Sequence, residues 1–227
     1  MIADLVMLAK RYIDLPYFIG IDLWNEPKTD CVWADWACAA GRFGNAILEA
    51  NPNLLIIVEG GGFMTWWSGN LQGVAQQPVV ISNPSKLVYS VHDYGTCVFN
   101  QTWFWTPGYP GDLYNHWNTY WGYLLTAPEP STVLIGELGC PMTYYKDLQW
   151  IDMFTRYLNG DFDLNGGNEL KSGDQGVSWL YWNLSPGADT GGIYENDWKT
   201  IDKNKMDTIN GNKFGTKQNI FGKGKLF

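Results

Sequence analysis

Apolar and polar positions along the chain follow two periods, one typical of strands and one typical of helices. Five short apolar runs have the character of strands buried in a parallel sheet, at residues 17–24, 54–59, 87–91, 132–137 and 177–182. Between them, apolar residues recur at helical spacing over residues 2–11, 33–50, 112–126 and 146–158, with a short amphipathic segment near 200–210. This alternation predicts a parallel α/β sheet with right-handed crossovers.

Five strands leave two architectures open. A closed (β/α)8 barrel has eight strands and typically about 250 residues, so roughly three βα units, on the order of 100 residues, would precede this chain. An open doubly wound sheet fits five strands as they stand, but its first βα turn should carry a glycine-rich phosphate-binding signature, which the sequence lacks. In either case we expect a single domain over residues 1–227.

Polar or aromatic side chains stand at the carboxyl ends of these strands, where parallel α/β folds bind ligands and carry out catalysis. They are Glu26, Glu59, His92, Tyr94, Glu137 and Trp182. A lone carboxylate there can be a structural salt bridge or a helix cap, and a histidine, tyrosine or tryptophan can simply belong to the core. Two carboxylates at the ends of apolar strands, Glu26 and Glu137, favour a catalytic pair for acid–base chemistry.

Composition narrows the classes of partner. A net charge of −8 and a pI of about 4.6 argue against nucleic acid and against anionic membrane surfaces. The 13 tryptophans and 13 tyrosines exceed what a core needs, so we expect some to be exposed for binding. Two histidines without carboxylates at helical offsets do not indicate zinc, and the glycine run at 60–62 lacks the lysine of a phosphate loop. We therefore expect no metal and no cofactor.

Four cysteines, at positions 31, 38, 97 and 140, match neither a zinc ribbon nor a CxxC redox motif. An even count suits two disulfides, and Cys31–Cys38 is the expected local pair, which would indicate an oxidising compartment. Buried free thiols in a cytosolic protein are the alternative.

Four motifs in chain order carry a family resemblance: Trp24-Asn25-Glu26-Pro27, His92-Asp93-Tyr94, Gly136-Glu137-Leu138-Gly139, and Trp182-Asn183 with residues 189–193. Together they resemble glycoside hydrolase family 5. Segments 54–59, 66–73 and 101–104 are similar to those of its bacterial-type endo-β-1,4-glucanases, and the match covers about residues 2 to 200. The resemblance implies a (β/α)8 TIM barrel, incomplete here, with about strands 4 to 8 present and the first three βα units missing.

The resemblance also implies a reaction, the retaining hydrolysis of internal β-1,4-glucosidic bonds in a glucan. Glu26 matches the family's general acid/base and Glu137 its nucleophile. Retention needs two carboxyls about 5–5.5 Å apart, one protonated and one ionised. Asn25 is then expected to hold the sugar 2-hydroxyl, Tyr94 to donate a hydrogen bond to Glu137, and His92 to contact the substrate or the carboxyl pair.

Further sugar contacts are expected from aromatic side chains, because the apolar C–H face of a pyranose suits an aromatic ring. Trp182 would stack on the sugar at the cleavage point. Contacts in more distant subsites are expected from Trp66, Trp67 and Gln101. The enzyme of this interpretation is a secreted, extracellular monomer whose signal peptide lies outside this chain.

The sequence departs from the family pattern at its start. The family carries an arginine near the end of strand 2 and a histidine near the end of strand 3, and this sequence begins in the helix before strand 4. Met1 is therefore interpreted as an internal methionine of a longer protein. Two alternatives stay open: a non-catalytic glycan-binding remnant of such an enzyme, and a family-5 hydrolase acting on mannan or another β-glucan.

Overall fold

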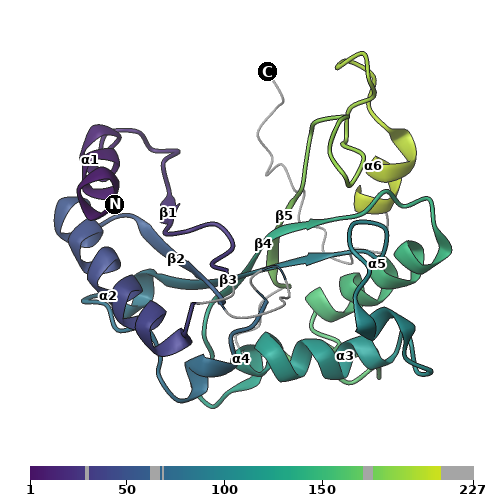
Figure 1. Cartoon of the computed structure of the whole chain (residues 1–227), viewed down its shortest axis with the longest axis horizontal. Helices are drawn as coiled ribbons and strands as arrows, with labels where there is room; N and C mark the ends of the chain where they lie inside the picture. Colours follow the sequence, from purple (N-terminus) through teal and green to yellow (C-terminus); the bar gives the residue numbers. More distant parts are fainter. Residues whose placement is uncertain (29–30, 62–66, 68, 171–175, 211–227) are drawn as a thin grey trace. The chain divides into compact units, whose positions relative to one another are not determined.

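The computed structural model describes residues 1–28, 31–61, 67, 69–170 and 176–210 (Figure 1). Its strands are β1 Gly20–Asp22, β2 Leu55–Glu59, β3 Leu87–Tyr94, β4 Val133–Gly139 and β5 Ser178–Tyr181. Its α-helices are α1 Ile2–Arg11, α2 Trp33–Ala50, α3 Asp112–Trp117, α4 Tyr123–Thr126, α5 Tyr145–Leu158 and α6 Lys203–Asn210. The expected strands and helices are confirmed in kind and order. Among the described residues, no helix is both long enough and apolar enough to cross a membrane.

The strands form one sheet in which spatial order follows chain order, β1-β2-β3-β4-β5. β1 pairs with β2 in parallel, with Ile21 opposite Ile56, and β2 pairs with β3 in parallel, with Val58 opposite Tyr89. A sheet that always advances in one direction is typical of a (β/α)8 barrel. A doubly wound sheet would instead reverse its strand order at a switch point.

The first strand is shorter than the sequence predicts. The apolar run 17–24 was expected to be buried on both faces, and this is wrong, because Tyr17 is 92% exposed and Ile19 is 67% exposed. Only Gly20–Asp22 pair with a neighbour, and β1 is an edge strand of the described sheet. Ile21 and Leu23 are the residues of this run that enter the core.

Contacts divide the described chain into two compact units. The first comprises residues 1–92 and 131–134. In it, α2 packs closely on β2: a Cβ at Gly44 would lie 3.0 Å from a methyl of Ile56 and 2.9 Å from one of Ile81, so a larger residue would push these side chains away. The indole of Trp36 in α2 donates to the backbone carbonyl of Glu59 at 2.9 Å. This bond fixes the carboxyl end of β2.

The second unit comprises residues 93–130 and the described residues from 135 onward. Its core is aromatic, and α3 and α5 supply most of it, with a π-helical turn, η4 (Asn118–Gly122), joining α3 to α4 (Figure 1). Asp93 of β3 accepts hydrogen bonds from the indoles of Trp117 at 2.7 Å and Trp150 at 2.9 Å. Two helices therefore hold the end of β3.

The cysteines do not pair as expected. Cys38, Cys97 and Cys140 carry free thiols, so the predicted Cys31–Cys38 disulfide is absent. The physical reason is side-chain direction. Cys31 lies before α2 with its sulfur toward Gly61, where a Cβ would come within 3.3 Å of it, whereas Cys38 lies on the exposed face of α2.

Candidate active site

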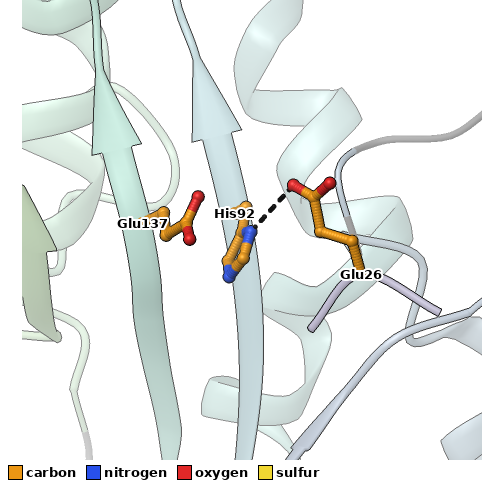
Figure 2. Close-up of side chains that lie close together, drawn as sticks. All are labelled: Glu26, His92 and Glu137. Carbon is orange, nitrogen blue, oxygen red and sulfur yellow. Dashed lines mark hydrogen bonds and ion pairs between the residues drawn. The ribbon is translucent and has the colours of Figure 1, made fainter. Parts of the chain in front are cut away.

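Glu26 lies in the first unit, four residues beyond the end of β1. Its backbone has a φ of 47°, in the left-handed region that residues other than glycine rarely occupy. Two contacts hold it there. Its backbone N–H donates to Glu59 Oε2 at 2.7 Å, and its Oε1 lies 3.0 Å from Nδ1 of His92 (Figure 2). A strained backbone at a lone carboxylate is typical of functional sites.

His92 connects Glu26 to a second carboxylate. It is 3% exposed, and its Nε2 lies 3.3 Å from Oε1 of Glu59, which is fully buried. Its backbone N–H donates to the carbonyl of Trp67 at 3.0 Å. Sequence reasoning noted Glu59 at the end of a strand but assigned it no role. The feature of the sequence that could have drawn attention to Glu59 is that β2, like β4, is an apolar strand ending near a lone glutamate.

Asp22 adds a third carboxyl to this side of the site. It lies on β1 and shares a hydrogen bond with Glu59. Partial burial, that hydrogen bond and the charge of Glu59 together raise the pKa of the Asp22 carboxyl. Two carboxyls in contact cannot both ionise at low cost, so we expect the pair to hold one proton between them.

Glu137 lies in the second unit, and its partner is Tyr94. The strand β4 continues to Gly139, so Glu137 lies within the strand rather than at its end (Figure 2). The hydroxyl of Tyr94, which is 4% exposed, donates a hydrogen bond to Glu137 Oε2. A hydroxyl donor favours the ionised form of a carboxylate, which is the form that a nucleophile requires.

The spacing of His92 and Tyr94 follows from strand geometry. Side chains two residues apart on a strand share a face, while the residue between them points to the other face. β3 includes both residues, and Asp93 between them points toward the indoles of α3 and α5. One short strand segment thus supplies a partner for each candidate carboxylate.

The other predicted site residues occupy more exposed positions. Trp182, 41% exposed, directly follows β5, and its backbone N–H donates to the carbonyl of Leu138 at 2.8 Å, beside Glu137 in sequence. Asn25 is exposed, whereas Trp67 and Gln101 are half-buried. Trp66 lies outside the described residues. The sugar contacts expected of these residues stay predictions, as does the expectation that no metal or cofactor takes part.

Comparison with known proteins supplies the family. The model of the cellulase family, glycosyl hydrolase family 5, matches residues 2–188. An endoglucanase of Paenibacillus polymyxa is 39% identical over 229 residues, which cover 92% of this chain and 53% of that protein. The major extracellular endoglucanase of Xanthomonas campestris pv. campestris is 33% identical over 223 residues, which cover 90% of this chain and 42% of that protein. The chain thus spans about half the length of these curated relatives.

Solved structures of endoglucanases share the fold of this chain. The catalytic domain of the Xanthomonas campestris endoglucanase superposes with a TM-score of 0.75 at 32% identity, covering 95% of this chain and 62% of that one. A cellotetraose complex of the Pyrococcus horikoshii endocellulase superposes with a TM-score of 0.76 at 30% identity, covering 92% of this chain and 61% of that one. The five described strands are therefore part of a (β/α)8 barrel, and because the family model matches most of its length, the chain belongs to glycosyl hydrolase family 5, the cellulase family.

Proposed function

We propose that this chain carries the catalytic carboxylates of a retaining endo-β-1,4-glucanase, with Glu26 as general acid/base and Glu137 as nucleophile. The observation that carries the proposal is that each carboxyl has a partner suited to its role. Glu26 contacts a histidine that can accept or donate a proton, and Glu137 accepts a hydrogen bond from the hydroxyl of Tyr94. The relatives named as endoglucanases support the same substrate class.

The first step of the proposed reaction forms a glycosyl–enzyme ester. An oxygen of ionised Glu137 attacks the anomeric carbon, the bond from that carbon to the glycosidic oxygen breaks, and the proton of Glu26 moves to the departing oxygen. Protonation matters because a sugar alkoxide is a poor leaving group. Glu26 must therefore enter this step protonated while Glu137 is charged.

The second step returns both carboxyls to their starting states. Ionised Glu26 removes a proton from water, the resulting hydroxide equivalent attacks the anomeric carbon, and the ester bond to Glu137 breaks. Two inversions at the same carbon give net retention. Tyr94 assists by bonding the Glu137 carboxylate both before attack and on release.

Substrate recognition in this proposal uses the exposed polar and aromatic side chains around the carboxylates. Asn25 holds the 2-hydroxyl, and Trp182 stacks on the sugar at the cleavage point. More distant subsites use Trp66, Trp67 and Gln101. A neutral glucan also suits a chain with a net charge of −8, which would repel polyanionic substrates.

We propose further that residues 1–227 belong to one catalytic domain and that the protein acts as a monomer on β-1,4-glucan outside the cell. Support for the location comes from the Xanthomonas relative, whose name describes it as extracellular. The finding of free thiols removes the disulfide as an independent argument for an oxidising compartment.

The roles can be separated with substrates of different leaving-group ability. On a soluble cellulose derivative, Glu137→Gln and Glu26→Gln should both lose hydrolysis. On an aryl cellobioside with an acidic phenol, which needs no protonation to depart, Glu26→Gln should still form the ester, and azide should restore turnover and yield a β-glycosyl azide. Glu49→Gln, at an exposed position of α2, is the matched control and should retain wild-type rates.

Two outcomes would contradict the proposal. Azide rescue of Glu137→Gln with a β-configured product would exchange the two roles. The second outcome concerns the wild-type protein. If it binds cello-oligosaccharide, and neither it nor the variants release reducing ends, the glycan-binding interpretation is favoured.

A further inference from the structure

Lys205 is a buried lysine that no step of the proposed reaction uses. It lies on α6 in the second unit and is 3% exposed. Its Nζ donates to two backbone carbonyls, those of Thr190 and Gly192, each at 2.9 Å. Both carbonyls belong to the loop that follows β5. The ammonium group therefore connects α6 to that loop.

Burial of this ammonium group is unfavourable in itself. A charged group that leaves water loses its hydration, and hydrogen bonds to carbonyls return only part of that free energy. Loss of water also lowers the pKa of Lys205. An apolar side chain of similar length would fill the same position without this cost. Stability alone does not explain a lysine here, so the geometry that its hydrogen bonds impose calls for an explanation.

Thr190 connects the anchored loop to Trp182. The side chain of Thr190 is fully buried, and its Oγ1 donates to the backbone carbonyl of Trp182 at 2.6 Å. Thr190 therefore accepts a hydrogen bond from Lys205 on its own carbonyl and donates one to Trp182 from its hydroxyl. Two successive hydrogen bonds thus lead from the ammonium group to the main chain of the tryptophan.

The main chain of Trp182 also lies against β4. Its N–H donates to the carbonyl of Leu138 at 2.8 Å. A Cβ on Gly139 would lie 2.5 Å from the carbonyl oxygen of Trp182 and 2.7 Å from Cγ2 of Thr190, so these groups are in close contact with the end of β4. The Trp182 backbone is therefore held between Thr190 and the strand that carries Glu137, while its side chain is 41% exposed.

We propose that Lys205 is a positioning residue that acts through Thr190 to hold the backbone of Trp182, so that the exposed indole is placed to stack on the sugar at the cleavage point. The inference rests on the proposed function in taking Trp182 to be the sugar platform. The anchor from Lys205 to the Trp182 carbonyl is independent of that role. Placement matters because a displacement of about 1 Å can cost on the order of 100-fold in rate.

The placement of Trp182 can be followed without any substrate. In protein labelled with fluorotryptophan, the 13 tryptophans give fluorine NMR signals, and Trp182→Phe identifies the signal of Trp182. Lys205→Met removes the ammonium group and keeps the length of the side chain, so it should shift or broaden that signal. Lys203→Met removes an exposed lysine from the same helix and should leave the signal unchanged. An unmoved Trp182 signal in folded Lys205→Met overturns the proposal.

Variants of Thr190 test the intermediate hydrogen bond, and they decide the question if Lys205→Met does not fold. Thr190→Val removes the hydroxyl with little change of shape, and it should disturb the Trp182 signal as Lys205→Met does. Thr190→Ser keeps the hydroxyl and should give a signal close to that of the wild type. If Thr190→Ser disturbs the signal as much as Thr190→Val, packing rather than the hydrogen bond places Trp182, and the inference is wrong.

A double-mutant cycle separates positioning from a general loss of stability. Calorimetry measures cellotetraose binding in the Glu137→Gln background, where the proposed nucleophile is absent and the ligand stays intact. Lys205→Met should weaken binding by about 10-fold when Trp182 is present. In the Trp182→Ala background the same change should weaken binding by less than about twofold, because the ring that Lys205 positions is gone.

Equal losses in the two backgrounds would refute the inference, since Lys205 would then act on binding by a route that does not include Trp182. Absence of cellotetraose binding by the protein with Lys205 and Trp182 intact would refute the proposed function instead. The fluorine signals would still decide in that case whether Lys205 places Trp182, because they are recorded without ligand.

Discussion

Replacing Asp93 by asparagine is expected to change how stability depends on pH. Asp93 lies between His92 and Tyr94 and points the other way, into the helices of the second unit, where two indoles donate to it at 2.7 and 2.9 Å. Burial raises the pKa of this carboxyl more than those two hydrogen bonds lower it, to about 7 from an ordinary value of 3.8.

The sign follows from proton binding. Between pH 4 and pH 7 the native state holds a proton on Asp93 that the unfolded chain has released, so stability falls as pH rises through this window. The difference between 3.8 and about 7 corresponds to on the order of 4 kcal/mol. The asparagine of the Asp93→Asn variant does not titrate, so its contribution to stability does not change with pH. Its amide nitrogen cannot accept the hydrogen bond of an indole, and this loss lowers the free energy of unfolding by about 1–3 kcal/mol at every pH.

The variant should therefore be less stable than the wild type near pH 4 and equally or more stable near pH 9. Urea unfolding, followed by the fluorescence of the 13 tryptophans, gives both free energies of unfolding across the range. Every other titrating group is common to the two proteins and cancels in the difference. Glu129→Gln, at an exposed carboxyl of the same unit, is the control. A wild-type-minus-variant difference that stays constant within about 0.5 kcal/mol from pH 4 to pH 9 would refute the reasoning.

Three further changes test the catalytic side, the core and the thiols. Tyr94→Phe should lower kcat by about 10- to 1,000-fold with a smaller change in KM, because it removes a donor to the proposed nucleophile, and steady-state hydrolysis of an aryl cellobioside measures this. Gly122→Ala should destabilise by about 2–4 kcal/mol in thermal or urea unfolding, because its Cβ would lie 1.7 Å from a buried tyrosine hydroxyl, whereas Gly167→Ala, with open space around it, should not. Cys38 should react with a thiol reagent in native protein well before Cys140, which is buried and whose thiol pKa is raised by that burial. Peptide mass mapping without reductant measures this, and earlier labelling of Cys140, or a Cys38 already held in a disulfide before the reagent is added, would contradict the reasoning.

The strand-end residues were predictable because a parallel sheet places its carboxyl ends along one edge. Apolar runs ending near Glu26 and Glu137, and a His-x-Tyr pair at the end of a third run, were enough to nominate the groups that the structure places in contact within each unit. Because His92 and Tyr94 are two residues apart, a strand places both side chains on the same face, and the sequence alone predicts this.

Other features depend on side-chain direction, which periodicity does not determine. Cys31 and Cys38 are close in sequence, but one precedes α2 and faces Gly61, and the other lies on the outer face of the helix. The apolar run 17–24 has the composition of a strand, yet β1 comprises only three of its residues. The length of a strand depends on how far the neighbouring strand runs beside it, and the apolar pattern does not contain that information. The left-handed backbone of Glu26 left no mark in the sequence, since the residue is not glycine or asparagine.

Glu59 shows why a motif search reaches candidate reacting groups before the groups that contact them. The contacts of Glu59 became visible only in the structure: it bonds the backbone of Glu26 on one oxygen and approaches the ring of His92 on the other. Its strand lies between β1, which Glu26 follows, and β3, which carries His92, so the sheet order places β2 next to both. A glutamate on the strand between those two can approach both groups, as the distances of 2.7 Å to the backbone nitrogen of Glu26 and 3.3 Å to Nε2 of His92 show.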